Sequence, residues 1–403
     1  MLNSKTGERE LAYLVKIDDI IPIEGADRVE TAIVGGWHIM VQKNQFKPRD
    51  IAVYFEIDSK VPEVEPFMFL EPKHFKIKTQ KYFKGRVLSQ GLLMALDDFT
   101  IDGEEPSWVT STKHRISQGI NVEHEFLTKE LNITYAVEED NKRKANSEDK
   151  YKKMARRHPS IFKQPFIRWM MRHKWGKKIL FALFGRSKDK KTGWPNWVTK
   201  TDEERIQNIP NIVQVKKSWI ATEKIDGTST TATYRKIGKR KHEFYICSRN
   251  VVFDKPDKKC FYETNVYTEM AEKYNFEQVL ADIVDRYDLE WATLQGETYG
   301  EGIQKRDYGL KERNFAGFNL IFSDRGRLNS IEAKAIMAEY GIPWVPIVDE
   351  HFILPDTVDE LLEIANDKSL IDGGMREGLV FRSEDGVQSF KAVSNQFLLK
   401  YHQ

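Results

Sequence analysis

Residues 141–200 carry 19 Lys or Arg against 3 Asp or Glu, and this segment divides the chain into two parts with different patterns. The chain of 403 residues has a formal net charge of only +2, so the remainder is acidic in sum. A local excess of positive charge is typical either of a surface that binds a polyanion or of a solvated linker. The sequence therefore predicts two folded regions joined by a basic segment, in keeping with the two or three domains expected at this length.

The part before the basic segment has the pattern of short β-strands. Apolar runs alternate with turn residues such as Gly35-Gly36 and the stretch from Pro62 to Pro66. Regularly spaced short strands are typical of a five-stranded OB-type β-barrel, a fold often used to bind nucleic acids, although any small β domain would share this periodicity. We therefore assign residues 1–136 to an OB-like nucleic-acid-binding domain. Its predicted strands fall within residues 11–23, 30–43, 50–58 and 86–96.

Residues 137–193 are predicted to be a basic linker with an amphipathic helical part. Residues 137–160 are polar, highly charged and poor in apolar side chains, which favours a linker. From Ile161 on, aromatic residues such as Phe166 and Trp169 alternate with Arg and Lys, as in a pair of amphipathic basic helices. We expect the aromatic side to dock on the following domain and the basic side to face outward. A nucleic-acid groove and a membrane surface are the alternatives.

Residues 194–403 have the mixed pattern of an α+β domain, in which strand-like runs alternate with longer helical stretches. The fold class expected for the whole chain is therefore α+β, with an OB-type β-barrel in front. The predicted strands include residues 218–225, 228–235, 242–249, 292–299, 315–322 and 377–383, and the predicted helical segments include residues 265–287 and 330–341.

Composition disfavours several classes of protein. No apolar run reaches the roughly 20 residues that a membrane span needs, and the N-terminus has no basic start followed by an apolar signal core. Cys247 and Cys260 are the only cysteines, too few for a disulfide scaffold or a Cys-rich zinc site. We expect a cytoplasmic protein without structural zinc and without a membrane partner.

One short string carries the strongest chemical signal. Residues 223–229, Glu-Lys-Ile-Asp-Gly-Thr-Ser, place Lys224 at the end of a strand-like run, before a glycine turn and small hydroxyl residues. Taken alone, a K-x-D-G string is equally well explained by a surface lysine before a β-turn. Further motifs follow it in order, namely Ser248-Arg249-Asn250, Gly296-Glu297, Phe318, Glu377 to Phe381 with the sequence EGLVF, and Lys391.

These six motifs, in this order, resemble those of the covalent nucleotidyltransferase superfamily of ligases and capping enzymes over residues 220–400. The resemblance implies an ATP-grasp-like two-sheet ligase domain in which Lys224 attacks the α-phosphate of ATP and becomes attached to AMP. Only a neutral amine is nucleophilic, whereas a free lysine has a pKa of about 10.4. We expect Lys391 and a divalent metal to favour the neutral form of Lys224 and to neutralise charge on the phosphate.

The remaining nucleotide contacts follow from the same resemblance. Glu223 is expected to contact the adenine, whereas Ser229 and Arg249 match positions near the ribose and the phosphates. Ile225 and Gly227 complete the nucleotide-binding string around the lysine. Each of these roles is an expectation from the matched motif positions.

Three acidic residues, Asp226, Glu297 and Glu377, are expected to lie near Mg²⁺ or Mn²⁺. Such ions keep several waters and take few direct protein ligands, so we expect mostly outer-shell contacts. Glu297 also matches the acidic position that contacts the ribose hydroxyl. Phe318 is expected to stack on the purine, although its strand would equally suit a core phenylalanine.

The last motif departs from the K-x-K pattern of some RNA ligases, because Lys391 is followed by Ala392 and Val393. The second lysine is missing at that spacing. Lys400 lies nine residues farther on, and we expect it to supply the second charge to the nucleotide from a different direction.

The order of the two domains indicates which group of ligases the chain resembles. A β domain in front, with the last motif only a dozen residues before Gln403, resembles the Naegleria/Deinococcus-type RNA ligases over about residues 10–110 and 195–403. The resemblance implies an ATP-dependent RNA ligase, with Mg²⁺ or Mn²⁺, that acts on an RNA or RNA/DNA nicked duplex. We also expect a monomer with a role in RNA repair. It would join a 3′-hydroxyl RNA end to an adenylylated 5′-phosphate. The alternatives are a DNA nick ligase, a capping-type guanylyltransferase, and a nucleic-acid-binding protein with a decayed ligase domain.

Overall fold

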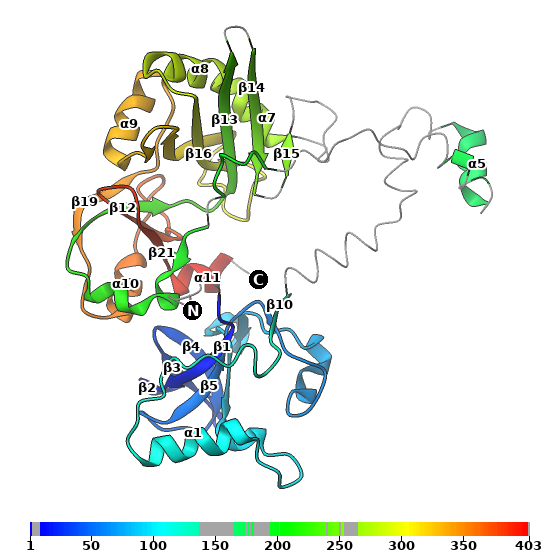
Figure 1. Cartoon of the computed structure of the whole chain (residues 1–403), viewed down its shortest axis with the longest axis vertical. Coiled ribbons are helices and arrows are strands. Elements are labelled where there is room, and N and C mark those ends of the chain that lie inside the picture. Colours follow the sequence, from blue (N-terminus) through cyan, green and yellow to red (C-terminus); the bar gives the residue numbers. More distant parts are fainter. Residues whose placement is uncertain are drawn as a thin grey trace.

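A computed structural model describes residues 1, 9–136, 164–173, 176, 179, 180, 194–200, 202–238, 241–249, 251–253 and 265–401. An N-terminal β domain and a C-terminal α+β domain lie side by side, and helix α5 (Pro165–Arg172) lies apart from both (Figure 1). Within the described ranges, no helix combines the length and the apolar character needed to cross a bilayer.

The N-terminal domain contains two three-stranded antiparallel sheets, with the strand orders β1-β5-β9 and β2-β3-β4. The strands predicted at 11–23, 30–43 and 86–96 are confirmed, but each of these runs contains two strands. Gly35 and Gly36 both have positive φ and form the two-residue turn of the β3–β4 hairpin, which suits the twist of the flanking strands. The elements are β1 (Ala12–Lys16), β2 (Asp19–Pro22), β3 (Val29–Val34), β4 (Trp37–Gln42), β5 (Ile51–Phe55), β6 (Ser59–Lys60), η1 (Met68–Lys73), β7 (Gln80–Tyr82), η2 (Phe83–Gly85), β8 (Val87–Ser89), β9 (Leu92–Ala95), η3 (Leu96–Phe99), α1 (Ser107–Ser117) and β10 (Thr134–Tyr135).

Strand β5 explains why this domain has two cores. Val53 and Phe55 pack into the cluster that includes Val109 of α1, whereas Ala52 and Tyr54 pack into the cluster on the other face. Because neighbouring side chains of a strand point to opposite faces, a continuous apolar run is what a strand buried on both faces requires.

The two domains meet at two helices of the C-terminal domain, α10 (Val358–Ala365) and α11 (Asn395–Tyr401). Leu88 of β8 packs against Leu398 and Leu399 of α11. The ammonium of Lys81 donates a hydrogen bond of 2.6 Å to the carbonyl oxygen of Leu399. The apolar contact of Leu88 with α11 and the hydrogen bond from Lys81 therefore join the two domains.

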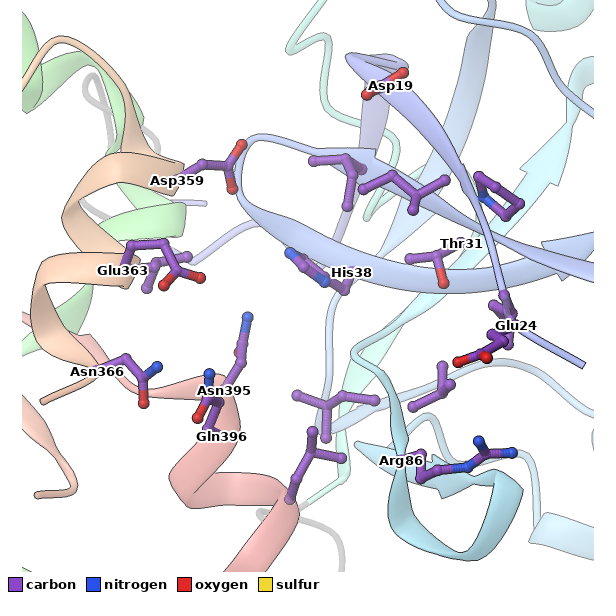
Figure 2. Close-up of a pocket in the computed structure, with 18 of the residues that line it drawn as sticks. Asp19, Glu24, Thr31, His38, Arg86, Asp359, Glu363, Asn366, Asn395 and Gln396 are labelled. Carbon is purple, nitrogen blue, oxygen red and sulfur yellow. The ribbon is translucent and has the colours of Figure 1, made fainter. Parts of the chain in front are cut away.

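A cavity of about 690 Å³ lies beside this contact, between the N-terminal domain and α10. Figure 2 shows His38 of β4 directed toward Asp359 and Glu363 of α10. Burial lowers the pKa of His38, and the two carboxylates oppose that shift. The cavity is therefore predominantly acidic on the side of α10.

The C-terminal domain consists of two sheets, as the resemblance implied. Their strand orders are β15-β14-β13-β16-β17-β18 and β11-β21-β20-β12-β19, and all pairs are antiparallel except β11 with β21. The elements are β11 (Glu204–Arg205), η4 (Ile206–Asn208), η5 (Pro210–Gln214), β12 (Ser218–Lys224), β13 (Thr228–Gly238), β14 (Lys241–Ser248), β15 (Val252–Phe253), α7 (Val266–Lys273), α8 (Phe276–Arg286), β16 (Trp291–Gly300), β17 (Arg313–Phe322), β18 (Gly326–Arg327), α9 (Ser330–Glu339), β19 (Ile347–Ile353), α10, β20 (Gly378–Ser383), β21 (Ser389–Val393) and α11.

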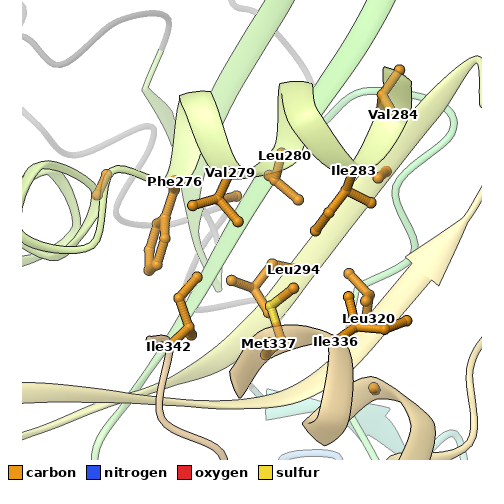
Figure 3. Close-up of a cluster of buried hydrophobic side chains, with 14 of the residues drawn as sticks. Phe276, Val279, Leu280, Ile283, Val284, Leu294, Leu320, Ile336, Met337 and Ile342 are labelled. Atoms are coloured by element: carbon orange, nitrogen blue, oxygen red, sulfur yellow. The ribbon is translucent and has the colours of Figure 1, made fainter. Parts of the chain in front are cut away.

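The helical segment predicted at 265–287 is two helices, α7 and α8, because Asn275 adopts a left-handed conformation between them. Helices α8 and α9 cover one face of the six-stranded sheet, and Figure 3 shows Leu280 and Ile283 of α8 above Leu294 of β16. Side chains on the opposite face of this sheet line the candidate active site.

The expected docking of the basic aromatic segment is not found for α5. Phe166 and Trp169 stack on each other with 5.9 Å between ring centroids, yet 64% and 46% of their surfaces are exposed. Most of the predicted linker, including Trp175, lies outside the described residues.

Candidate active site

A cavity of about 360 Å³ lies between the two sheets of the C-terminal domain. Strands β12, β20 and β21 supply one wall, and β13, β16 and β17 supply the other. Eleven of the twelve predicted site residues line it, and only Lys400 does not. The predicted residues that line it are Glu223, Lys224, Ile225, Asp226, Gly227, Ser229, Arg249, Glu297, Phe318, Glu377 and Lys391.

Lys224 is the last residue of β12, where it pairs with Gly378 of β20. Its ammonium donates a hydrogen bond of 2.8 Å to the Oε2 atom of Glu377. Burial lowers the pKa of Lys224, but Glu377 and Glu297 outweigh burial and the pKa is raised above its ordinary value. The expectation that Lys391 and a divalent metal together favour the neutral amine stays a prediction, because the carboxylates dominate the local field of Lys224 when no metal is bound.

Two of the surrounding carboxylates are strongly perturbed. Burial raises the pKa of Asp226 to about 6, with a further contribution from Glu377. Burial raises the pKa of Glu297 to about 8, Lys224 opposes this shift, and Glu377 adds to it. Crowded carboxylates that favour protonation are a common feature of sites that bind a cation.

The carboxylate set fits a hydrated metal ion and not a closed cage. Among the described residues, no three His, Cys, Asp or Glu side chains are placed to chelate a metal together. Asp226, Glu297 and Glu377 nevertheless line one cavity, where the charge of Glu377 raises the proton affinity of the other two. A divalent ion that keeps most of its waters would relieve that repulsion through outer-shell contacts.

Two cations lie at the mouth of the cavity on either side of one carboxylate. Asp202 accepts a hydrogen bond of 2.8 Å from Arg249 and one of 3.4 Å from Lys391. Burial lowers the pKa of Lys391, and the neighbouring charge of Lys224 lowers it further. Side chains of Arg249 and Lys391 thus converge on one anionic group, as they would on a phosphate.

The carboxylate of Glu223 is held from behind the cavity. It accepts hydrogen bonds from the Ser369 hydroxyl, at 2.5 Å, and from the Leu370 amide, at 2.7 Å. Burial raises the pKa of Glu223. Its carboxylate therefore fixes the loop at residues 369–371 against β12, and the adenine contact expected for this residue stays a prediction.

Lys400 does not reach the cavity. Strand β21 ends at Val393, and α11 turns the chain so that Phe397 and Leu398 are buried while Lys400 is exposed. Its ammonium lies 5.0 Å from the ring centroid of Tyr401. The expectation that Lys400 supplies the second charge to the nucleotide is not supported, because the helix directs its side chain away.

Comparison with known proteins agrees with this geometry. Residues 217–402 match the family model of RNA ligases, and residues 11–96 match a model of an OB-fold domain. The C-terminal domain belongs to the RNA ligase family. A comparison with curated proteins gave no match.

Solved structures of Naegleria gruberi RNA ligase resemble this chain over nearly its whole length. A complex with pyrophosphate is 25% identical, covers 98% of this chain and 99% of the other, and gives a TM-score of 0.62. A variant with ATP and Mn is 25% identical over 98% of this chain and 100% of the other, with a TM-score of 0.64. Another variant, with AMP and Mn, is 26% identical over 98% and 99% of the chains, with a TM-score of 0.65. The chain thus combines an N-terminal OB-fold domain with a C-terminal RNA ligase domain.

Sequence reasoning missed several residues of this ligase site, above all Arg382. The guanidinium of Arg382 lies 5.5 Å from the ring centroid of Phe318 and is almost fully buried. It donates to Asn319 at 3.0 Å, to Thr222 at 3.1 Å and to Glu203 at 3.3 Å. The position of Arg382 directly after the EGLVF string could have indicated it. Phe318 is partly buried: it packs against the cluster that includes Ile225 and Tyr308, and it also lines the cavity.

Gly227 should be intolerant of any side chain. An added Cβ would lie 2.4 Å from the carbonyl oxygen of Thr298 and 2.8 Å from Cγ of Glu297. We expect Gly227→Ala to reduce the rate of lysyl-AMP formation by about 100-fold or more, since displacement of a site by about 1 Å has that effect. The measurement is single-turnover labelling with α-labelled ATP.

Gly238→Ala is the matched control, because an added Cβ there meets no atom within 4 Å. Equal labelling rates for the Gly227→Ala protein and the wild type would show that the turn adapts without cost.

Proposed function

We propose that this ligase seals nicks whose 3′-hydroxyl strand is RNA, through a covalent AMP on Lys224. The covalent AMP is supported by the cavity in which Lys224 faces Glu377, Glu297 and Asp226 on one side, with Arg249 and Lys391 at the mouth. The RNA strand is supported by the match of residues 217–402 to the RNA ligase family. A lysine that lies beside three carboxylates and near two cations is suited to attack a phosphate that binds together with a metal ion.

In the first step the Nζ lone pair of Lys224 attacks the α-phosphorus of ATP. A P–N bond forms, the bond from the α-phosphorus to the bridging oxygen breaks, and pyrophosphate leaves with the electron pair. The ammonium must lose a proton first, and its hydrogen bond to Glu377 offers a path to an acceptor. Arg249 and Lys391 would stabilise the charge that accumulates on the phosphates.

A divalent ion near Asp226, Glu297 and Glu377 would supply positive charge that lowers the pKa of Lys224 and stabilises the phosphate. Without it, the raised pKa of Lys224 keeps the amine protonated at neutral pH. The matched structures with Mn are those of the Naegleria gruberi enzyme.

In the second step a 5′-phosphate oxygen of the nucleic acid attacks the phosphorus of lysyl-AMP, and the P–N bond breaks to return the lysine amine. In the third step the 3′-hydroxyl attacks the 5′-phosphate, and AMP leaves as the new phosphodiester forms. The half-buried ring of Phe318, supported by Arg382, offers a surface on which the adenine can stack.

The test has two parts: one identifies the nucleotide that labels the protein, and the other identifies the 3′-hydroxyl strand that is sealed. The protein is incubated with α-labelled ATP or GTP and Mg²⁺ or Mn²⁺, and label on the protein is measured after denaturation. Nicked duplexes of one sequence, with either RNA or DNA at the 3′-hydroxyl end, are then sealed in parallel. We expect label from ATP and sealing confined to the RNA 3′-hydroxyl end.

Other outcomes identify the alternatives. Equal sealing of all-DNA nicks would indicate a DNA nick ligase, and label from GTP would indicate a capping-type enzyme. Nucleic-acid binding without any label would indicate a decayed ligase domain.

A further inference from the structure

One stretch of the OB-fold domain is strongly basic and lies against the ligase domain. Residues 72–96 contain no Asp or Glu, and they contain Lys73, Lys76, Lys78, Lys81, Lys84 and Arg86. The end of the chain, residues 386–403, also lacks Asp and Glu. The hydrogen bond of Lys81 to Leu399 brings the two stretches together.

This basic surface reaches the candidate active site through the loop after β16. Gln304 lines the nucleotide cavity and donates a hydrogen bond of 3.0 Å to the carbonyl of Gly227. The next residue, Lys305, lies close enough to Lys81 to lower its pKa, although burial of Lys81 is the larger cause. The cavity mouth, Lys305 and the β7–β8 hairpin are therefore neighbours.

The exposed cations of this surface are not neutralised by the protein. Lys84, Arg86, Lys305 and Lys400 are exposed, and within the described residues none of them forms an ion pair with a carboxylate. By contrast, exposed cations elsewhere are often paired, such as Arg286 with Glu339. Unpaired cations keep their full charge for an external anion.

The neighbouring cavity at the domain junction has the opposite charge. Asp19, Glu24, Asp359 and Glu363 line it, and Figure 2 shows Arg86 at the opposite side from Asp359. A phosphate backbone would be repelled by these carboxylates. A polyanion that approaches from the side of Lys84, Lys305 and Lys400 avoids these carboxylates.

We propose that the β7–β8 hairpin of the OB-fold domain, together with Lys305 and Lys400, binds the phosphate backbone of the RNA strand whose 5′-phosphate enters the nucleotide cavity. We define this basic face as Lys81, Lys84, Arg86, Lys305 and Lys400. Lys81 also joins the two domains, so the face keeps a fixed position relative to Lys224. Lys400, which does not reach the nucleotide, acquires a role on this face. This proposal rests on the proposed function.

The test compares two triple variants with the same change in net charge. The first, Lys84→Gln/Arg86→Gln/Lys305→Gln, removes exposed cations of the basic face and leaves Lys81 in place. The matched control, Lys236→Gln/Lys241→Gln/Lys334→Gln, removes three exposed lysines from β13, β14 and α9, elements of the ligase domain that lie away from the OB-fold domain in Figure 1.

Three quantities are measured for each full-length variant: the rate of lysyl-AMP formation, the Kd for a nicked duplex at several salt concentrations, and the rate of sealing of a preadenylylated nick. We expect the first variant to keep the labelling rate and to bind the duplex at least about 10-fold more weakly. The slope of log affinity against log salt should fall by about 1 for each cation that no longer binds a phosphate. The control should match the wild type in all three quantities.

The outcomes separate this inference from the proposed function. Absence of lysyl-AMP in the wild type would contradict the proposed function. Normal lysyl-AMP with equal duplex affinity in the two triple variants would overturn the basic face alone. Parallel loss of labelling and binding in the first variant would also overturn it, because these residues would then support the fold or the nucleotide site.

Discussion

Lys224→Ala should form no lysyl-AMP, while its affinity for ATP falls far less than its activity. Loss of an attacking residue reduces catalysis by on the order of 10⁴-fold or more, whereas the rest of the cavity still binds the nucleotide. The measurement is covalent label from α-labelled ATP, with equilibrium binding of ATP measured on the same preparation. Sealing of a nick that already carries AMP on its 5′-phosphate should continue, because that step no longer needs the nucleophile.

Two variants control this result. Lys224→Arg keeps a cation beside Glu377 and should also fail to label, since a guanidinium is not a nucleophile. Lys241→Ala removes an exposed lysine of β14 and should label at the rate of the wild type. Any covalent label on the Lys224→Ala protein would assign the nucleophile to another residue, and Lys391 would be the first to test.

Arg382→Ala should be the most destabilising single change in the site. The side chain of Arg382 is 3% exposed, and its guanidinium donates hydrogen bonds to Asn319, Thr222 and Glu203. Its removal takes this donor from the buried oxygens of Asn319 and Thr222 and from the partly buried carboxylate of Glu203, which costs about 3 to 5 kcal/mol of the free energy of unfolding. For a domain of this size the Tm should fall by roughly 10 °C. ATP affinity should also fall, because Phe318 loses the support behind its ring.

Arg325→Ala offers a matched comparison. Arg325 also lies over a phenylalanine, 5.0 Å from the ring centroid of Phe322, but it is 47% exposed and its ion pair with Glu332 is 3.8 Å long. Removal of such a surface arginine should cost less than about 1 kcal/mol. If thermal unfolding of the two variants gave the same Tm, the buried network around Arg382 would not stabilise the domain.

The sequence predicted the residues of the cavity wall because they are determined locally. Glu223 and Lys224 end strand β12, and Asp226 lies between that strand and the turn at Gly227, so their spacing fixes how they emerge at the strand end. The carbonyl of Thr298 leaves no room for a Cβ at position 227, which is the reason for glycine there. Ordered motifs could also predict which distant strands contribute, because the strand pairing brings Gly378 opposite Lys224.

The sequence by itself thus determined the domain order, the two-sheet fold and eleven of the cavity-lining residues. Only the tertiary structure decided the charge state of Lys224, since its partner Glu377 is 153 positions away and burial depends on both sheets. The same holds for Asp202 between Arg249 and Lys391, and for Lys400, whose direction depends on where α11 begins. Local spacing determines which side chains share a strand, whereas distances across sheets and between domains depend on packing that no short string contains.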